Sequence, residues 1–250
     1  MKKVFVIVTA LSGLYIIFAL TGLAGLDTDA GGIIYSLVII ATLLFVCSCV
    51  FTGAARHGGI PLLAGALGLG LLAVSELYTF AYIYLLQGES IDITVSNYSR
   101  PCAYLFFMLT LTQLLHIKHR KIPRIVISTM AAVLVILIFY AVVTDNLVLL
   151  NYATLLIAVL CILPAILLLI NTKSMFACSV IVLCCLDIAH RLMVLYQPQG
   201  LWQGFIVFYP LIYLWLGWAL LKDSDKLKTT PCHSERSEES SGKDPSQCSG

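Results

Sequence analysis

Residues 175–197 read MFACSVIVLCCLDIAHRLMVLYQ, an apolar stretch of membrane-spanning length that is interrupted by Asp187, His190 and Arg191. In a helix, positions i, i+3 and i+4 share one face, so this carboxylate, imidazole and guanidinium lie on the same side. Charged groups in hydrocarbon are costly unless they are paired or face the protein interior. This helix face is therefore the first candidate for a functional site.

The rest of the chain is similarly apolar. Of its 250 residues, 60% are hydrophobic and 11% are charged, and the mean hydropathy is +0.97. This composition excludes a soluble core of that size and indicates a multi-pass protein of the cell membrane. The net charge of +2 is small, and no basic run is interleaved with aromatic residues. We therefore expect the lipid bilayer, and no nucleic acid, among its partners.

The chain is predicted to be an all-α integral membrane protein with a bundle of about eight transmembrane helices. Strict alternation of the barrel kind is absent, so helices are needed to satisfy the backbone in lipid. The first segment follows a basic start and could be a signal peptide, but its length favours a retained helix. The predicted spans are residues 4–24, 32–54, 60–87, 102–117, 125–144, 147–171, 175–197 and 201–221.

The distribution of basic residues predicts how these spans are oriented. One side of the eight-span arrangement receives Lys2, Lys3, Arg56, Lys118, Arg120, Lys121, Arg124 and Lys173, and the other receives Arg100 and Arg191. Because cytoplasmic loops are enriched in Lys and Arg, both termini are expected in the cytoplasm. The charged end of residues 175–197 then lies in the outer half of the bilayer.

A second buried acid, Glu76, is predicted at the same depth in the bilayer as Asp187. Glu76 lies 11 residues before Gln87, and Asp187 lies 10 before Gln197, so both are roughly 15 Å below the predicted outer ends. Arg191 is about one turn higher and could bridge the two carboxylates if these helices are neighbours. Two interpretations remain open: an ion pair that fixes helix register, and a ligand or proton site.

Other polar side chains lie a turn or more inside the outer ends, where an interfacial aromatic belt does not account for them. Together with the charged residues they predict an outward-facing polar pocket of the kind that binds small ligands. The candidate ligand-binding or ion-pair residues are Glu76, Asp187, His190, Arg191, Tyr78, Asn151, Gln203 and Tyr209.

Catalytic and metal-binding patterns are missing from the sequence. It has no known hydrolase, metalloprotease or phosphate-loop motif, and its nine cysteines lack zinc-ligand spacing. We therefore expect no cofactor, metal or catalytic residue, and favour a ligand-sensing or signal-input module that acts through a separate signalling partner. Its general plan resembles the seven- or eight-helix input regions found ahead of bacterial signalling domains.

Two other functions remain open. One is a membrane enzyme acting on a lipid or isoprenoid, with Glu76 or Asp187 as general acid or base and His190 assisting. The other is a proton-coupled small-molecule carrier that uses the same acids. The expected ligand is accordingly a small molecule or a lipid.

The composition changes abruptly at Lys222. Residues 222–250 contain five Lys or Arg and six Asp or Glu, with few apolar residues, so this tail is predicted to be disordered. Within it, residues 232–240 read CHSERSEES. This run resembles the translation of an interspersed repeat seen at the ends of many unrelated bacterial open reading frames.

Overall fold

The computed structural model describes residues 29–57, 59–86, 95–117, 147–196 and 207–228, with isolated positions between 6 and 14 and between 132 and 144. Every described element is helical. The main elements are α2 (Asp29–His57), α3 (Ile60–Phe80), the π-helix η1 (Ala81–Leu85), α4 (Val95–Ile117), α6 (Leu147–Thr172), α7 (Met175–Tyr196) and α9 (Tyr209–Lys228). Most of the predicted spans 4–24 and 125–144 lies outside the described residues.

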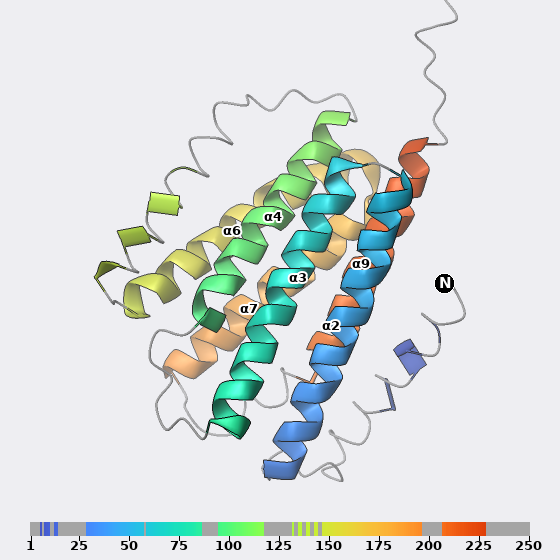
Figure 1. Cartoon of the computed structure of the whole chain (residues 1–250). Coiled ribbons are helices and arrows are strands. Elements are labelled where there is room, and N and C mark those ends of the chain that lie inside the picture. The colour runs from blue at the N-terminus through green and yellow to red at the C-terminus, as the bar shows by residue number, and fades with distance from the viewer. Residues whose placement is uncertain are drawn as a thin grey trace, which may run out of the picture.

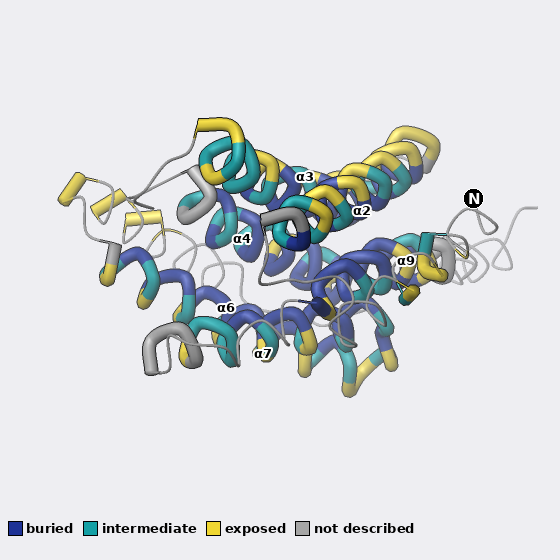
Figure 2. Tube along the Cα trace, turned by 90° about the horizontal axis from the view of Figure 1, so that it is seen from below, coloured by how far each residue is buried: buried dark blue, intermediate teal, exposed yellow. Residues whose placement is uncertain are grey.

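These helices form two layers. α2, α3 and α4 lie side by side in one layer, and α6, α7 and α9 form the other (Figures 1 and 2). Contacts between neighbours run from α2 through α3, α4, α6, α7 and α9 back to α2, so the six helices close into a ring. The buried faces of both layers meet between them (Figure 2).

The outer surface of the bundle is apolar. Leu37, Leu67 and Leu163 are exposed, whereas Ser75 and Asp187 are buried. This distribution reverses that of a soluble protein, in which charged residues are mostly exposed. Within the described residues, four helices are long and apolar enough to cross a membrane: Gly31–Arg56, Ile60–Leu85, Val148–Thr172 and Met175–Leu192. Length, composition and surface therefore all support a membrane location.

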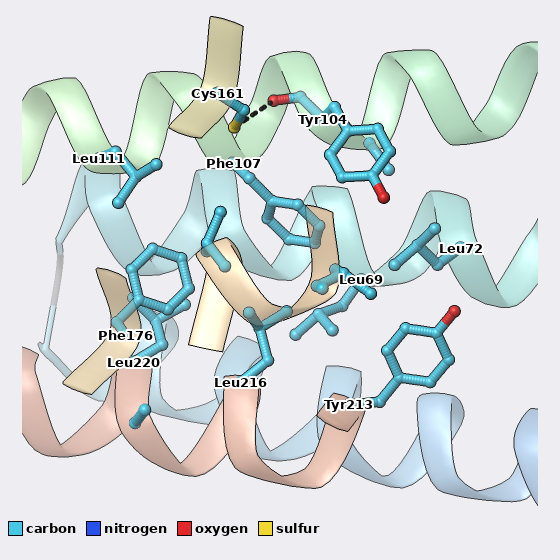
Figure 3. Packing of buried hydrophobic residues seen from close by; sticks show 14 of the residues in the cluster. Leu69, Leu72, Tyr104, Phe107, Leu111, Cys161, Phe176, Tyr213, Leu216 and Leu220 are labelled. Carbon is cyan, nitrogen blue, oxygen red and sulfur yellow. Dashed lines mark hydrogen bonds between the residues drawn. The ribbon is translucent and has the colours of Figure 1, made fainter. Parts of the chain in front are cut away.

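Small residues let the helices of the bundle approach closely. A Cβ atom on Gly68 of α3 would lie 2.7 Å from Cε1 of Phe107 and 3.2 Å from the Ala103 carbonyl oxygen, both on α4. The Phe107 ring fills the space between the layers with Leu69 and Leu216 (Figure 3). The glycine thus lets α4 pack against the backbone of α3.

Two helices have bounds that matter for the site. α4 begins at Val95, although its span was predicted from residue 102, and Arg100 therefore lies within the helix. α9 continues to Lys228, beyond the end predicted at Leu221. The predicted disorder of residues 229–250 falls outside the described residues.

The extension of α9 has a local cause. The Asp223 carboxylate accepts hydrogen bonds from the Ser174 hydroxyl, at 2.6 Å, and from the Phe176 amide, at 3.1 Å. Ser174 in turn accepts a hydrogen bond from the Ala177 amide. An acid at a helix N-terminus satisfies unpaired amides and complements the helix dipole. Asp223 therefore caps α7, and its charge is buried with partners instead of being solvated in a tail.

Candidate functional site

Arg100 of α4 connects acids from both layers of the bundle. Its Nη2 donates to Oε1 of Glu76 on α3 at 2.7 Å, and its Nη1 donates to Oδ1 of Asp187 on α7 at 3.2 Å. α3 and α4 belong to one layer and α7 to the other. One guanidinium therefore ties the two layers together through charge-assisted hydrogen bonds, which are stronger than neutral ones.

Asp187 is the most enclosed member of this cluster. Besides Arg100, its Oδ1 accepts a hydrogen bond from the Tyr209 hydroxyl at 2.8 Å. Its Oδ2 lies 3.5 Å from Nε of Arg191, an ionic contact longer than a hydrogen bond. Arg191 also donates from Nη1 to Oδ1 of Asn151 on α6 at 2.7 Å.

The charges of the cluster balance. Glu76 and Asp187 carry two negative charges, and Arg100 and Arg191 carry two positive charges. A buried carboxylate is tolerable when a cation and further hydrogen bonds compensate its lost hydration. The four residues, here called the ionic cluster, are therefore a self-compensating set within the apolar bundle.

Aromatic rings close the inner side of the ionic cluster. The Tyr209 ring lies 6.0 Å from Cζ of Arg100, within the range of a cation–π contact. Its centroid is 5.7 Å from that of Tyr213, and the His190 ring meets it edge-on at 6.4 Å. Tyr104 and Tyr213 enter the core from α4 and α9, on opposite sides (Figure 3). Tyr209 thus contacts both the ionic cluster and the aromatic part of the core.

The ionic cluster lies toward one end of the bundle. Arg100 is in the second turn of α4, Asn151 is in the second turn of α6, and Tyr209 begins α9. The exposed fraction of the side chain is 22% for Arg100, 14% for Glu76, 14% for Arg191 and 3% for Asp187. Access from outside is therefore greatest at Arg100, equal at Glu76 and Arg191, and least at Asp187.

The structure brings together some of the predicted site residues and not others. Five of them belong to one network of contacts, and these are Glu76, Asp187, Arg191, Asn151 and Tyr209. His190 packs against Tyr209 at the edge of that network. Tyr78 stacks on Tyr82 of η1, with ring centroids 6.2 Å apart. Gln203 lies outside the described residues.

The bridging guanidinium differs from the expected one. Arg191 was expected to join the two carboxylates, but Arg100 does so, while Arg191 contacts Asp187 and Asn151. The reason is geometric: α4 packs beside α3, and its early start brings Arg100 down to the level of Glu76. One sequence signal could have identified Arg100 as the bridge. This arginine lies two residues before a predicted span, at the same end of the bundle as the two buried acids.

The described part of the chain contains no group of three or more His, Cys, Asp or Glu residues able to hold a metal ion. The assembled site is thus a set of ion pairs with aromatic and amide neighbours, contributed by α3, α4, α6, α7 and α9. No protein family, curated protein or solved structure that was compared with this chain matches it.

Proposed function

We propose that this chain is a multi-pass protein of the cell membrane with about eight spans and both termini in the cytoplasm. The four long apolar helices support the membrane placement, and the bias of Lys and Arg supports the orientation. The ionic cluster then lies in the outer half of the bilayer. A reporter domain fused after Lys228 should be active in the cytoplasm; activity on the outer side would contradict this orientation.

Within that arrangement, the proposed function is ligand sensing or signal input through the ionic cluster. The observation that carries this proposal is the position of Arg100 between Glu76 and Asp187, on opposite layers of the bundle. A ligand shifts a conformational equilibrium only when it binds one arrangement better than another. A ligand that changes the partners of Arg100 meets this condition, because those partners hold the layers together.

The burial of Asp187 favours binding over chemistry. An enzyme acting on a lipid or isoprenoid, or a proton-coupled carrier, needs a carboxylate that exchanges a proton with substrate or water. Asp187 is 2% exposed and is shared among Arg100, Arg191 and Tyr209. These contacts restrict proton exchange at Asp187, so they count against either alternative where it uses this acid.

The α7–α9 pair offers a route for the signal. Tyr209 at the start of α9 bonds to Asp187 in the second half of α7. Farther along α9, Asp223 accepts hydrogen bonds from Ser174 and the Phe176 amide at the start of α7. Coupling between distant sites is carried by hydrogen-bond networks and rigid secondary elements of this kind. We propose that a displacement at the ionic cluster moves the cytoplasmic end of α9, and that a separate signalling partner binds there and responds to the movement.

A screen for thermal stabilisation tests the proposed function. Purified protein in phosphatidylcholine nanodiscs should gain stability with members of a small-molecule library, and the gain should vanish in Asp187→Asn. Asp223→Asn is the matched control, because it makes the same chemical change at the other end of α7 and should keep the gain. Turnover of lipid extracts, or pH-dependent flux into vesicles, that depends on Asp187 would instead support the enzyme or the carrier.

A further inference from the structure

The two acids of the ionic cluster are held to different degrees. Among the described residues, Asp187 is contacted by Arg100, Arg191 and Tyr209, and its side chain is 3% exposed. For Glu76, the hydrogen bond recorded among the described residues comes from Nη2 of Arg100, and its side chain is 14% exposed. Glu76 is therefore the less enclosed of the two carboxylates.

Arg100 presents a suitable surface for exchange of the Glu76 carboxylate. Its side chain is the most exposed of the four, and its two terminal nitrogens point to different carboxylates. The planar guanidinium fork matches the oxygens of carboxylate and phosphate groups. The Tyr209 ring and the contact with Asp187 hold this plane from the inner side. An incoming anion would thus meet a preoriented donor at the position that Glu76 occupies.

We propose that the ligand of this site carries a carboxylate or phosphate group, which displaces Glu76 from Arg100 while Asp187 keeps its partners. This inference rests on the proposed sensing function. The exchange replaces one anion by another, so Arg100 never remains buried without a counter-charge, the condition that is most costly in an apolar environment. The anionic group can belong to a soluble molecule or to a lipid headgroup, because Arg100 would recognise both by the same chemistry.

Neutralising Glu76 tests this competition directly. Acetate and inorganic phosphate, each titrated calorimetrically into the protein in phosphatidylcholine nanodiscs, should bind Glu76→Gln roughly tenfold more tightly than wild type, because the competing charge is removed. Arg100→Gln should lose this binding. Arg56→Gln, an exposed arginine on α2, is the matched control and should bind as wild type does.

A second measurement distinguishes the two sources of the anion. If the anion is a headgroup, native mass spectrometry after exposure to phosphatidylglycerol should show more retained lipid in Glu76→Gln than in wild type or Arg56→Gln, and less in Arg100→Gln. Retention that is equal in all variants, together with tighter acetate or phosphate binding by Glu76→Gln, identifies a soluble anion.

The comparison of Glu76→Gln with wild type decides the inference even if Arg100→Gln does not fold. If none of the three probes binds Glu76→Gln more tightly, the anionic ligand class is wrong. The sensing function itself would still stand if the library screen finds a cationic or neutral ligand whose effect disappears in Asp187→Asn. Different results therefore contradict the anionic ligand class and the sensing function.

Discussion

Nη1 of Arg100 and Oδ1 of Asp187 are 3.2 Å apart, although the two residues are separated by 87 positions in the sequence. The contact joins the start of α4 to the second half of α7, across the two layers of the bundle. Because both groups lie in an apolar bundle, each one makes the burial of the other tolerable. This dependence leads to measurable consequences for stability.

Loss of Arg100 should destabilise the fold strongly. Arg100→Met leaves Glu76 without its recorded partner and removes one cation from Asp187, and breaking a buried pair in this way costs about 3–5 kcal/mol. Denaturant unfolding in nanodiscs measures the change. Arg56→Met, on the exposed surface of α2, should change stability by less than about 0.5 kcal/mol; equal losses in both variants would contradict the role of Arg100.

Removing both partners of the Glu76–Arg100 pair should lower the free energy of unfolding by less than the sum of the two single losses. Glu76→Gln combined with Arg100→Met leaves no unpaired charge from this pair, while Asp187 keeps Arg191 and Tyr209. We expect a coupling free energy of about 1–3 kcal/mol in a double-mutant cycle. Simple additivity of the two changes would show that the 2.7 Å contact has no energetic role.

The hydroxyl of Tyr209 should contribute to stability independently of its ring. Tyr209→Phe keeps the packing against Tyr213 and removes the 2.8 Å hydrogen bond to Asp187, so a loss of about 1.5–3 kcal/mol is expected for a bond to a charged group. Tyr152→Phe on α6 is the control, because Tyr152 is exposed. The midpoint of thermal unfolding should be clearly lower for Tyr209→Phe than for Tyr152→Phe.

The cap of α7 should act as one unit. Ser174→Ala and Asp223→Ala should each cost about 1–2 kcal/mol, because each leaves an N-terminal amide of α7 without its acceptor. Since Ser174 also donates to Asp223, the double variant should lose less than the sum of the single losses. Faster amide hydrogen exchange in the first turn of α7 would locate the effect.

Two glycines of α3 should respond differently to alanine. At Gly68 a Cβ atom would meet Phe107 at 2.7 Å, whereas at Gly70 its nearest neighbour would be Sγ of Cys47 at 3.6 Å, an ordinary contact. We expect Gly68→Ala to cost about 1–3 kcal/mol through overpacking. Gly70→Ala should be neutral or stabilising by up to about 1 kcal/mol, because alanine favours the helix. Equal unfolding midpoints would contradict the close packing of α3 on α4.

The features predicted correctly from the sequence are those that depend on local sequence, namely the length of an apolar stretch and the spacing of residues within one helix. Apolar length alone indicated the helices at residues 60–87, 147–171 and 175–197, since a helix that crosses a bilayer needs about 20 such residues. The spacing of Asp187 and Arg191 placed them on one face, and they lie 3.5 Å apart in an ionic contact. A depth count put Glu76 near the level of Asp187, because the rise per residue of a helix is constant.

The sequence by itself therefore determined the membrane-length helices and the presence of charges inside them, while the tertiary structure decided which charges meet. Arg100 as the bridge, the Tyr209 hydrogen bond to Asp187 and the Asp223 cap on α7 all join different helices. Such contacts depend on which helices are neighbours and on how each is rotated. A helix that is apolar on all sides carries no stripe from which its inner face can be read.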